Sequence, residues 1–284
     1  MAQNETQRKN ETEWTPEEIS QRLYRYDKIA DRLDGWAAWG EKALAQYRSA
    51  GYVAVEGAYS QRQIDDALAA LHTLVFEDAK GARIQLTKPS SELKSYEERE
   101  RAVRKVSDYV ECDDRLRAIA YDPQLLARVE AILGDEAVLV QDMALLKPPN
   151  GGGEKPWHQD MAYGPLAFQK AVVGVWIALD EAGLDNGCMH IIPGSHADGA
   201  VPHYAIRDLQ LCDAHVPVEQ DVAVPLQPGG LLFFHGLLKH GTPFNLSAKR
   251  RRALQFHYAP RSAAKLSPKE YKRFFTNEMT GAEC

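Results

Sequence analysis

The second half of the chain contains many short segments with the character of β-strands, and this pattern most constrains the fold. Apolar or alternating runs follow one another, with Gly, Pro, Asn and Asp between them, at residues 137–146, 172–177, 222–226, 230–234 and 253–258. Short strands separated by turns at modest spacing are typical of a sandwich or a barrel. The sequence therefore predicts a mainly β protein that also contains α-helices.

The first half of the chain has a mostly helical pattern. A capping box at Thr15 starts a first helix, and further amphipathic helices start near Ser60 and Pro123. Residues 52–56 form a short apolar run that predicts a strand. Residues 80–101 are polar and rich in turn formers, so we expect a mobile loop there.

The two halves together predict a single domain. With 284 residues, 44% of them hydrophobic, the chain can bury a large core. We expect a helical layer over about residues 14–135 to pack on a jelly-roll core over about residues 136–260, within one domain of residues 14–284. Residues 1–13 are polar and mixed in charge, and we expect them to form a disordered tail.

Composition and charge narrow the class of protein. A net charge of −6 argues against general nucleic-acid binding, because phosphate contacts need concentrated Lys and Arg. No apolar run approaches the ~18 residues of a membrane span, and the polar N-terminus does not resemble a signal peptide. Four widely spaced cysteines are expected to be free thiols in a reducing compartment: Cys112, Cys188, Cys212 and Cys284. These features predict a cytoplasmic protein that binds neither nucleic acid nor membrane.

A His-x-Asp motif follows a Gly/Pro-rich turn at residues 148–153. In extended backbone, residues two apart point to the same side, so His158 and Asp160 would face inward together while Gln159 points away. An imidazole and a carboxylate are two members of the 2-His-1-carboxylate set that binds non-haem Fe(II) and leaves positions open for further ligands. The alternative is a hydrogen-bonded pair without a metal.

A second histidine is needed to complete such a set. Chemistry alone does not choose it, because histidines in β-rich cores are often hydrogen-bonded packing residues. The sequence offers three candidates in or near predicted strands and four weaker ones, which are His235, His240 and His257, then His190, His196, His203 and His215.

Three segments in fixed order, at residues 158–160, 175–196 and 240–251, carry a family resemblance. In their spacing and accompanying turns they resemble the phytanoyl-CoA dioxygenase family of Fe(II)/2-oxoglutarate oxygenases, and most of all its phytanoyl-CoA dioxygenase domain-containing type. The resemblance is close over residues 137–260 and looser in the helical first half. It implies a double-stranded β-helix core, with Fe(II), 2-oxoglutarate and O₂ as cofactor and cosubstrates.

The resemblance also implies roles for single residues. His158, Asp160 and His240 match the iron ligands of the family. Arg251 matches the arginine that holds the far carboxylate of 2-oxoglutarate, and Thr242 matches a hydroxyl residue that supports the same carboxylate. A guanidinium suits this task because it offers a planar pair of donors to a carboxylate.

Three further positions match residues close to the cosubstrate or substrate. Trp176 matches an aromatic beside the metal, Lys105 a lysine near 2-oxoglutarate, and Gln141 a position that contacts substrate in related hydroxylases. Each has an alternative: Trp176 as a core residue, Lys105 as a solvated residue of a charged helix, and Gln141 as an ordinary polar residue inside the barrel.

The resemblance therefore predicts a dioxygenase that hydroxylates a C–H bond of a small-molecule or lipid-like substrate and releases succinate and CO₂. Asp160 favours hydroxylation, because halogenating relatives lack this carboxylate. Two alternatives stay open: a non-redox metal enzyme such as a cupin-like hydrolase or isomerase, and a catalytically silent metal-barrel binding module. Arg251 argues against the first, since that chemistry needs no dicarboxylate cosubstrate.

Overall fold

The computed structural model describes residues 14–76 and 81–284, so the predicted tail at residues 1–13 lies outside the described residues. Within them, the α-helices are α1 (Pro16–Leu23), α2 (Glu41–Ala50), α3 (Gln61–Phe76), α4 (Tyr96–Ala102), α5 (Asp114–Ala120), α6 (Pro123–Leu133) and α7 (Pro268–Phe275). Over the same ranges, no helix combines the length and the apolar character needed to cross a membrane.

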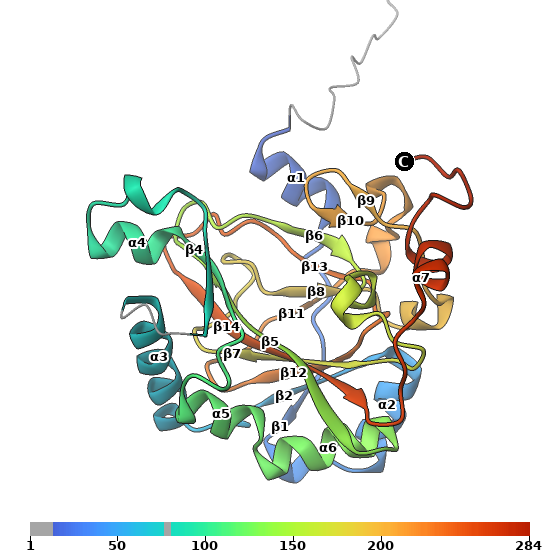
Figure 1. Ribbon diagram of the computed structural model, residues 1–284, viewed down its shortest axis with the longest axis horizontal. Helices are drawn as coiled ribbons and strands as arrows, with labels where there is room; N and C mark the ends of the chain where they lie inside the picture. Colours follow the sequence, from blue (N-terminus) through green and yellow to red (C-terminus); the bar gives the residue numbers. More distant parts are fainter. Residues whose placement is uncertain (1–13, 77–80) are drawn as a thin grey trace, which may run out of the picture.

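The strands form two main sheets that face each other (Figure 1). The large sheet has the order β1-β2-β12-β7-β14-β5-β4-β3 and the small sheet the order β11-β8-β13-β6, while β9 and β10 form a separate hairpin. The strands are β1 (Arg32–Asp34), β2 (Tyr52–Glu56), β3 (Arg83–Leu86), β4 (Val103–Ser107), β5 (Ala137–Lys147), β6 (Lys155–His158), β7 (Val173–Ala178), β8 (Met189–Ile191), β9 (Tyr204–Ala205), β10 (Leu209–Gln210), β11 (Val222–Val224), β12 (Leu231–His235), β13 (His240–Thr242) and β14 (Arg251–Pro260).

Alternation along the central strands separates two cores. In β7, Val175 and Ile177 pack with the apolar faces of α3, α5 and α6 on the outer side of the large sheet (Figure 1). Trp176 and Ala178 of the same strand point the other way and pack against the small sheet. Because side chains alternate along a strand, the inner face of the large sheet is free to carry a site between the sheets.

The first half of the chain contributes strands as well as helices. The capping box at Thr15 and the strand at residues 52–56 are present as predicted. The prediction of a mobile loop over residues 80–101 is wrong for its described part, which contains β3 and most of α4. Two local signals for these elements exist in the sequence: the polar/apolar alternation of Arg83–Leu86, and the residues of a capping box, in which Ser95 pairs with Glu98.

The C-terminal segment returns to the small-sheet side of the molecule. Helix α7 packs beside the segment that contains β9 and β10, and the backbone N–H of His203 donates to the carbonyl of Phe275 at 2.9 Å. The prediction of four free thiols is therefore wrong for Cys212 and Cys284, which form a disulfide. The two cysteines are 72 residues apart in the sequence and come together only because the chain after β14 returns to this side of the molecule.

Candidate metal centre

Three predicted ligands meet at one edge of the small sheet. His158 at the end of β6 pairs directly with His240 at the start of β13, and Asp160 begins a short 3₁₀ turn two residues after His158. One nitrogen of each histidine and one oxygen of Asp160 all lie within 4.8 Å of one another. The three side chains are buried, so the cluster excludes bulk water and can hold a metal ion.

The hydrogen bonds of the two histidines select one ring nitrogen for a metal. Nδ1 of His158 lies 2.7 Å from the carbonyl of Pro156, and Nδ1 of His240 lies 2.9 Å from the carbonyl of Leu238. A carbonyl oxygen only accepts, so each Nδ1 carries the proton. Both Nε2 atoms then offer a lone pair toward Oδ1 of Asp160, at 3.2 and 3.5 Å.

Burial keeps this site in the form that binds a cation. Burial, together with the adjacent His240, lowers the pKa of His158 to about 3, so its imidazole is neutral at ordinary pH. Burial raises the pKa of Asp160, but the neighbouring histidines outweigh it and hold that pKa well below its usual range. Neutral imidazoles and an ionised carboxylate suit a divalent transition metal.

The second oxygen of Asp160 is held from β14, which the sequence reasoning missed. Oδ2 lies 2.6 Å from Nε2 of His257 and 3.2 Å from the amide nitrogen of Gln255. His257, one of the candidate third ligands, therefore contacts the carboxylate and is not part of the three-residue cluster. A signal existed, because Gln255 and His257 share the inner face of β14 with Arg251.

The residue between the two β6 ligands is anchored behind the site. The side chain of Gln159 points away from the cluster, as predicted, and its amide nitrogen donates to the carbonyls of Gly199 and Leu237 at 2.8 Å. Its backbone N–H donates at 2.9 Å to Nε2 of His203, whose Nδ1 bonds the carbonyl of Val201. These bonds fix the backbone that carries His158 and Asp160.

Arg251 lies at the start of β14, on the same inner face, and is only 2% exposed. Its guanidinium carbon lies 5.4 Å from the ring centre of Trp176, and within the described part of the chain its Nε and one Nη have no hydrogen-bond partner. Burial lowers its pKa to about 10, so it remains a cation at neutral pH. Its neighbours Arg250 and Arg252 point outward and pair with Glu100 and Asp180. A buried cation with free donors is suited to bind an anion.

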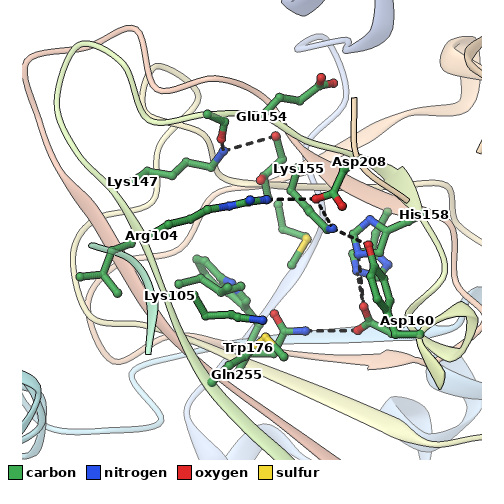
Figure 2. Close-up of a pocket in the computed structure, with 18 of the residues that line it drawn as sticks. Arg104, Lys105, Lys147, Glu154, Lys155, His158, Asp160, Trp176, Asp208 and Gln255 are labelled. Carbon is green, nitrogen blue, oxygen red and sulfur yellow. Dashed lines mark hydrogen bonds and ion pairs between the residues drawn. The ribbon is translucent and has the colours of Figure 1, made fainter. Parts of the chain in front are cut away.

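A cavity of about 310 Å³ joins the metal cluster to this arginine. Figure 2 shows His158, Asp160 and Trp176 among the residues that line it. Every residue predicted for the site lines it, namely Lys105, Gln141, His158, Asp160, Trp176, His240, Thr242 and Arg251. Lys105 lies on β4 and not on a charged helix, since α4 ends at Ala102. Lys147, the last residue of β5, is also buried here and donates to the carbonyl of Pro243 at 2.8 Å.

Four polar or charged side chains surround the mouth of the cavity, namely Arg104, Lys155, Tyr163 and Asp208. Figure 2 shows Arg104 of β4 reaching toward Asp208, which also binds Lys155. Lys155 in turn contacts the hydroxyl of Tyr163, and the Tyr163 ring lies edge-on to His158 with ring centres 5.7 Å apart. No local pattern predicts this group, because its members come from three distant segments.

Comparison with known proteins bears on this site. The family model described as phytanoyl-CoA dioxygenase (PhyH) matches residues 47–253. Phytanoyl-CoA dioxygenase domain-containing protein 1 of Rattus norvegicus is 31% identical over 178 residues, which are 60% of this chain and 61% of that protein. Peroxisomal phytanoyl-CoA dioxygenase of Bos taurus is 26% identical over 230 residues, or 75% of this chain and 66% of that protein. The chain thus spans less than two thirds of either relative.

A solved structure shares the fold. EvdO2 from Micromonospora carbonacea var. aurantiaca, complexed with 2-oxoglutarate, superposes with a TM-score of 0.65 at 23% identity and covers 82% of this chain and 96% of its own. This likeness confirms the predicted fold class, in which a double-stranded β-helix lies under a helical layer.

Proposed function

The chain belongs to the phytanoyl-CoA dioxygenase family, as its sequence predicted, and from this premise we propose that it is an Fe(II)- and 2-oxoglutarate-dependent dioxygenase. The reaction would convert 2-oxoglutarate, O₂ and a substrate C–H bond into succinate, CO₂ and an alcohol. The observation that carries the proposal is a single cavity with a three-ligand cluster at one end and the buried, unpaired donors of Arg251 at the other.

In this proposal His158, Asp160 and His240 hold the iron. Their Nε2 atoms and Oδ1 converge, and their remaining polar atoms are engaged by the chain's own carbonyls and by β14. Such outer contacts orient metal ligands and fix the tautomer of each histidine. Three protein ligands leave coordination positions for 2-oxoglutarate and O₂.

The cosubstrate would lie between the metal and Arg251. The guanidinium would bind its far carboxylate, with Thr242 supporting that carboxylate and Trp176 forming the adjacent wall. Lys105 would lie close to the cosubstrate, and Gln141 would contact the substrate from β5. The far carboxylate would then neutralise the charge of Arg251, which is buried where an unpaired cation is costly.

The bound iron would supply the redox chemistry that couples decarboxylation of 2-oxoglutarate to oxidation of the substrate. The protein positions the reactants and excludes water. Asp160 occupies the carboxylate position of the ligand set, which supports hydroxylation. The substrate proposed at this level is a small organic molecule, which matches a cavity of about 310 Å³.

The test is an anaerobic titration of the Fe(II)-loaded protein with 2-oxoglutarate, following the weak visible band that appears when a 2-oxo acid chelates Fe(II). We expect the band in wild type and a requirement for at least about tenfold more 2-oxoglutarate in Arg251→Ala, because charge-assisted bonds are lost. The matched control is Arg250→Ala, which removes the adjacent arginine that pairs with Glu100 outside the cavity.

Absence of the band in folded, metal-loaded wild type would contradict the proposal. Metal binding with turnover of another kind would then favour a non-redox metal enzyme, and metal binding without turnover a binding module. Equal effects of the Arg250 and Arg251 variants would contradict the role of Arg251.

A further inference from the structure

The mouth of the cavity is bridged by one carboxylate of the chain itself. Oδ2 of Asp208 accepts from Arg104 of β4 at 3.0 Å and from Lys155 of β6 at 2.7 Å. A single carboxylate oxygen therefore links β4 of the large sheet to β6 of the small sheet across the cavity (Figure 2).

Positive charge exceeds negative charge at this mouth. Arg104 and Lys155 share the one carboxylate of Asp208, and Lys105 has no ion-pair or hydrogen-bond partner among residues 14–76 and 81–284. The remaining carboxylate that lines this region, Glu154, is occupied by Arg207 at 2.9 Å. In a chain with a net charge of −6, a locally positive cavity mouth attracts anions.

The bridging carboxylate is carried by a turn and not by a strand of either main sheet. Asp208 lies in the turn between β9 and β10, which are strands of two residues each. Strands this short form few backbone hydrogen bonds with each other, and Asp208 itself lies outside them. The cations that it joins lie instead on β4 and β6, which are strands of the two main sheets. If another anion replaced the Asp208 carboxylate, Asp208 would move, and Arg104 and Lys155 would stay in place.

The cosubstrate does not account for these two cations. Arg251 and the metal cluster already provide both ends of a dicarboxylate site, and Lys155 lies instead beside Tyr163, whose ring contacts His158. Apolar side chains line the cavity between these groups, including Met143, Leu145 and Leu166. The space next to the mouth thus combines an anion site with an apolar surface.

Resting on the proposed function, we propose that the substrate is a carboxylate attached to an apolar carbon skeleton, and that its carboxylate replaces Asp208 at Arg104 and Lys155. Asp208 shows the geometry, since one carboxylate oxygen already accepts from both cations. In the free protein Asp208 occupies the site as a built-in competitor. Binding would release the β9–β10 turn. It would also hold the carbon skeleton near the metal ligands, since only the side chain of Tyr163 separates Lys155 from His158.

The experiment uses octanoate as the probe and its uncharged amide, octanamide, as the matched compound. Binding is measured by calorimetry, without O₂, on protein loaded with Fe(II) and saturated with 2-oxoglutarate, so that Arg251 is already engaged. We expect octanoate to bind wild type more tightly than octanamide does. Arg104→Gln should weaken octanoate binding about fivefold, the scale of a part-exposed ion pair.

Asp208→Asn should act in the opposite direction and tighten octanoate binding by about threefold, because it removes the competitor and a negative charge. Neither variant should change octanamide binding. The control is Arg83→Gln, since Arg83 is exposed, pairs with Asp108 and does not line the cavity.

Two results would overturn this inference: equal binding of octanoate and octanamide, or changes of octanoate affinity in the same direction in Arg104→Gln and Asp208→Asn. The second result would identify the bridge as a purely structural latch. The visible band of the 2-oxoglutarate titration is recorded first on each sample. Absence of the band would contradict the proposed function. If the band is present but octanoate and octanamide bind equally, only the proposed substrate class is contradicted.

Discussion

At the scale of single residues, the metal cluster depends on side chains that do not touch the metal. His257 and Gln255 hold the oxygen of Asp160 that faces away from the two ligand histidines. We expect His257→Phe to weaken binding of Co(II), a spectroscopic substitute for Fe(II), by about 10- to 100-fold, because an unsupported carboxylate rotates and loses its orientation. Absorption of the Co(II)-loaded protein measures this affinity.

The control for this variant is His215→Phe, which removes an exposed histidine outside the cavity. It should leave Co(II) affinity unchanged. Equal Co(II) affinities of wild type and His257→Phe would show that Asp160 keeps its position without the bond from His257.

At the scale of elements, the ring of Phe234 in β12 lies against the backbone of β7 because the second residue of β7, Gly174, has no side chain. A Cβ on Gly174 would lie 2.3 Å from the ring of Phe234, and that ring lies 4.8 Å from the imidazole of His240. Gly174→Ala should therefore lower the free energy of unfolding by about 1–3 kcal/mol through overpacking, and should weaken metal binding as the ring shifts toward His240. Urea unfolding of the metal-free protein measures the first effect, and Co(II) titration the second.

Gly164→Ala is the matched control, because a Cβ at Gly164 meets nothing within 4 Å. Its stability and metal affinity should equal those of wild type. A Gly174→Ala protein as stable as this control would mean that the sheet has room to adjust at this point.

At the scale of the whole molecule, buried neutral histidines make stability depend on pH. Burial lowers the pKa of His158 to about 3 and that of His203 to about 4, whereas an unfolded histidine titrates near about 6.5. Below about pH 6.5 the unfolded chain binds protons at these histidines that the folded chain does not bind. Their contribution to the free energy of unfolding is therefore fully present above about pH 6.5 and is lost as the pH falls. Between about pH 6.5 and pH 5.5 the metal-free protein should lose about 1 kcal/mol for each of these histidines.

Urea unfolding at the two pH values tests this, with His203→Asn as the diagnostic variant. Between these pH values, His203→Asn should lose about 1 kcal/mol less free energy of unfolding than wild type, because one titrating histidine is gone. An unchanged pH slope in the variant would show that His203 does not contribute. Metal loading should leave the His158 share of the slope unchanged, because this imidazole is already unprotonated in the folded, metal-free protein over this pH range.

Local pattern in the sequence determined a large part of this protein. Capping residues such as Thr15 marked the start of a helix, and period-two alternation along residues 250–252 puts Arg251 on the opposite face of its strand from Arg250 and Arg252. These features are local because hydrogen bonds and side-chain direction repeat every few residues along the chain. The spacing of His158 and Asp160 belongs to the same class of information.

The tertiary structure alone decided which distant segments meet. Pairing of β6 with β13 puts His158 opposite His240, and β14 brings His257 to Asp160. The Asp208 bridge and the disulfide of Cys212 likewise join segments with no shared local pattern. Strand alternation tells which face a residue occupies but not which strand lies beside it, because strand order depends on packing throughout the molecule. The residue types of the metal cluster could therefore be read from the sequence, whereas the side chains that hold Asp160 and close the cavity required the fold.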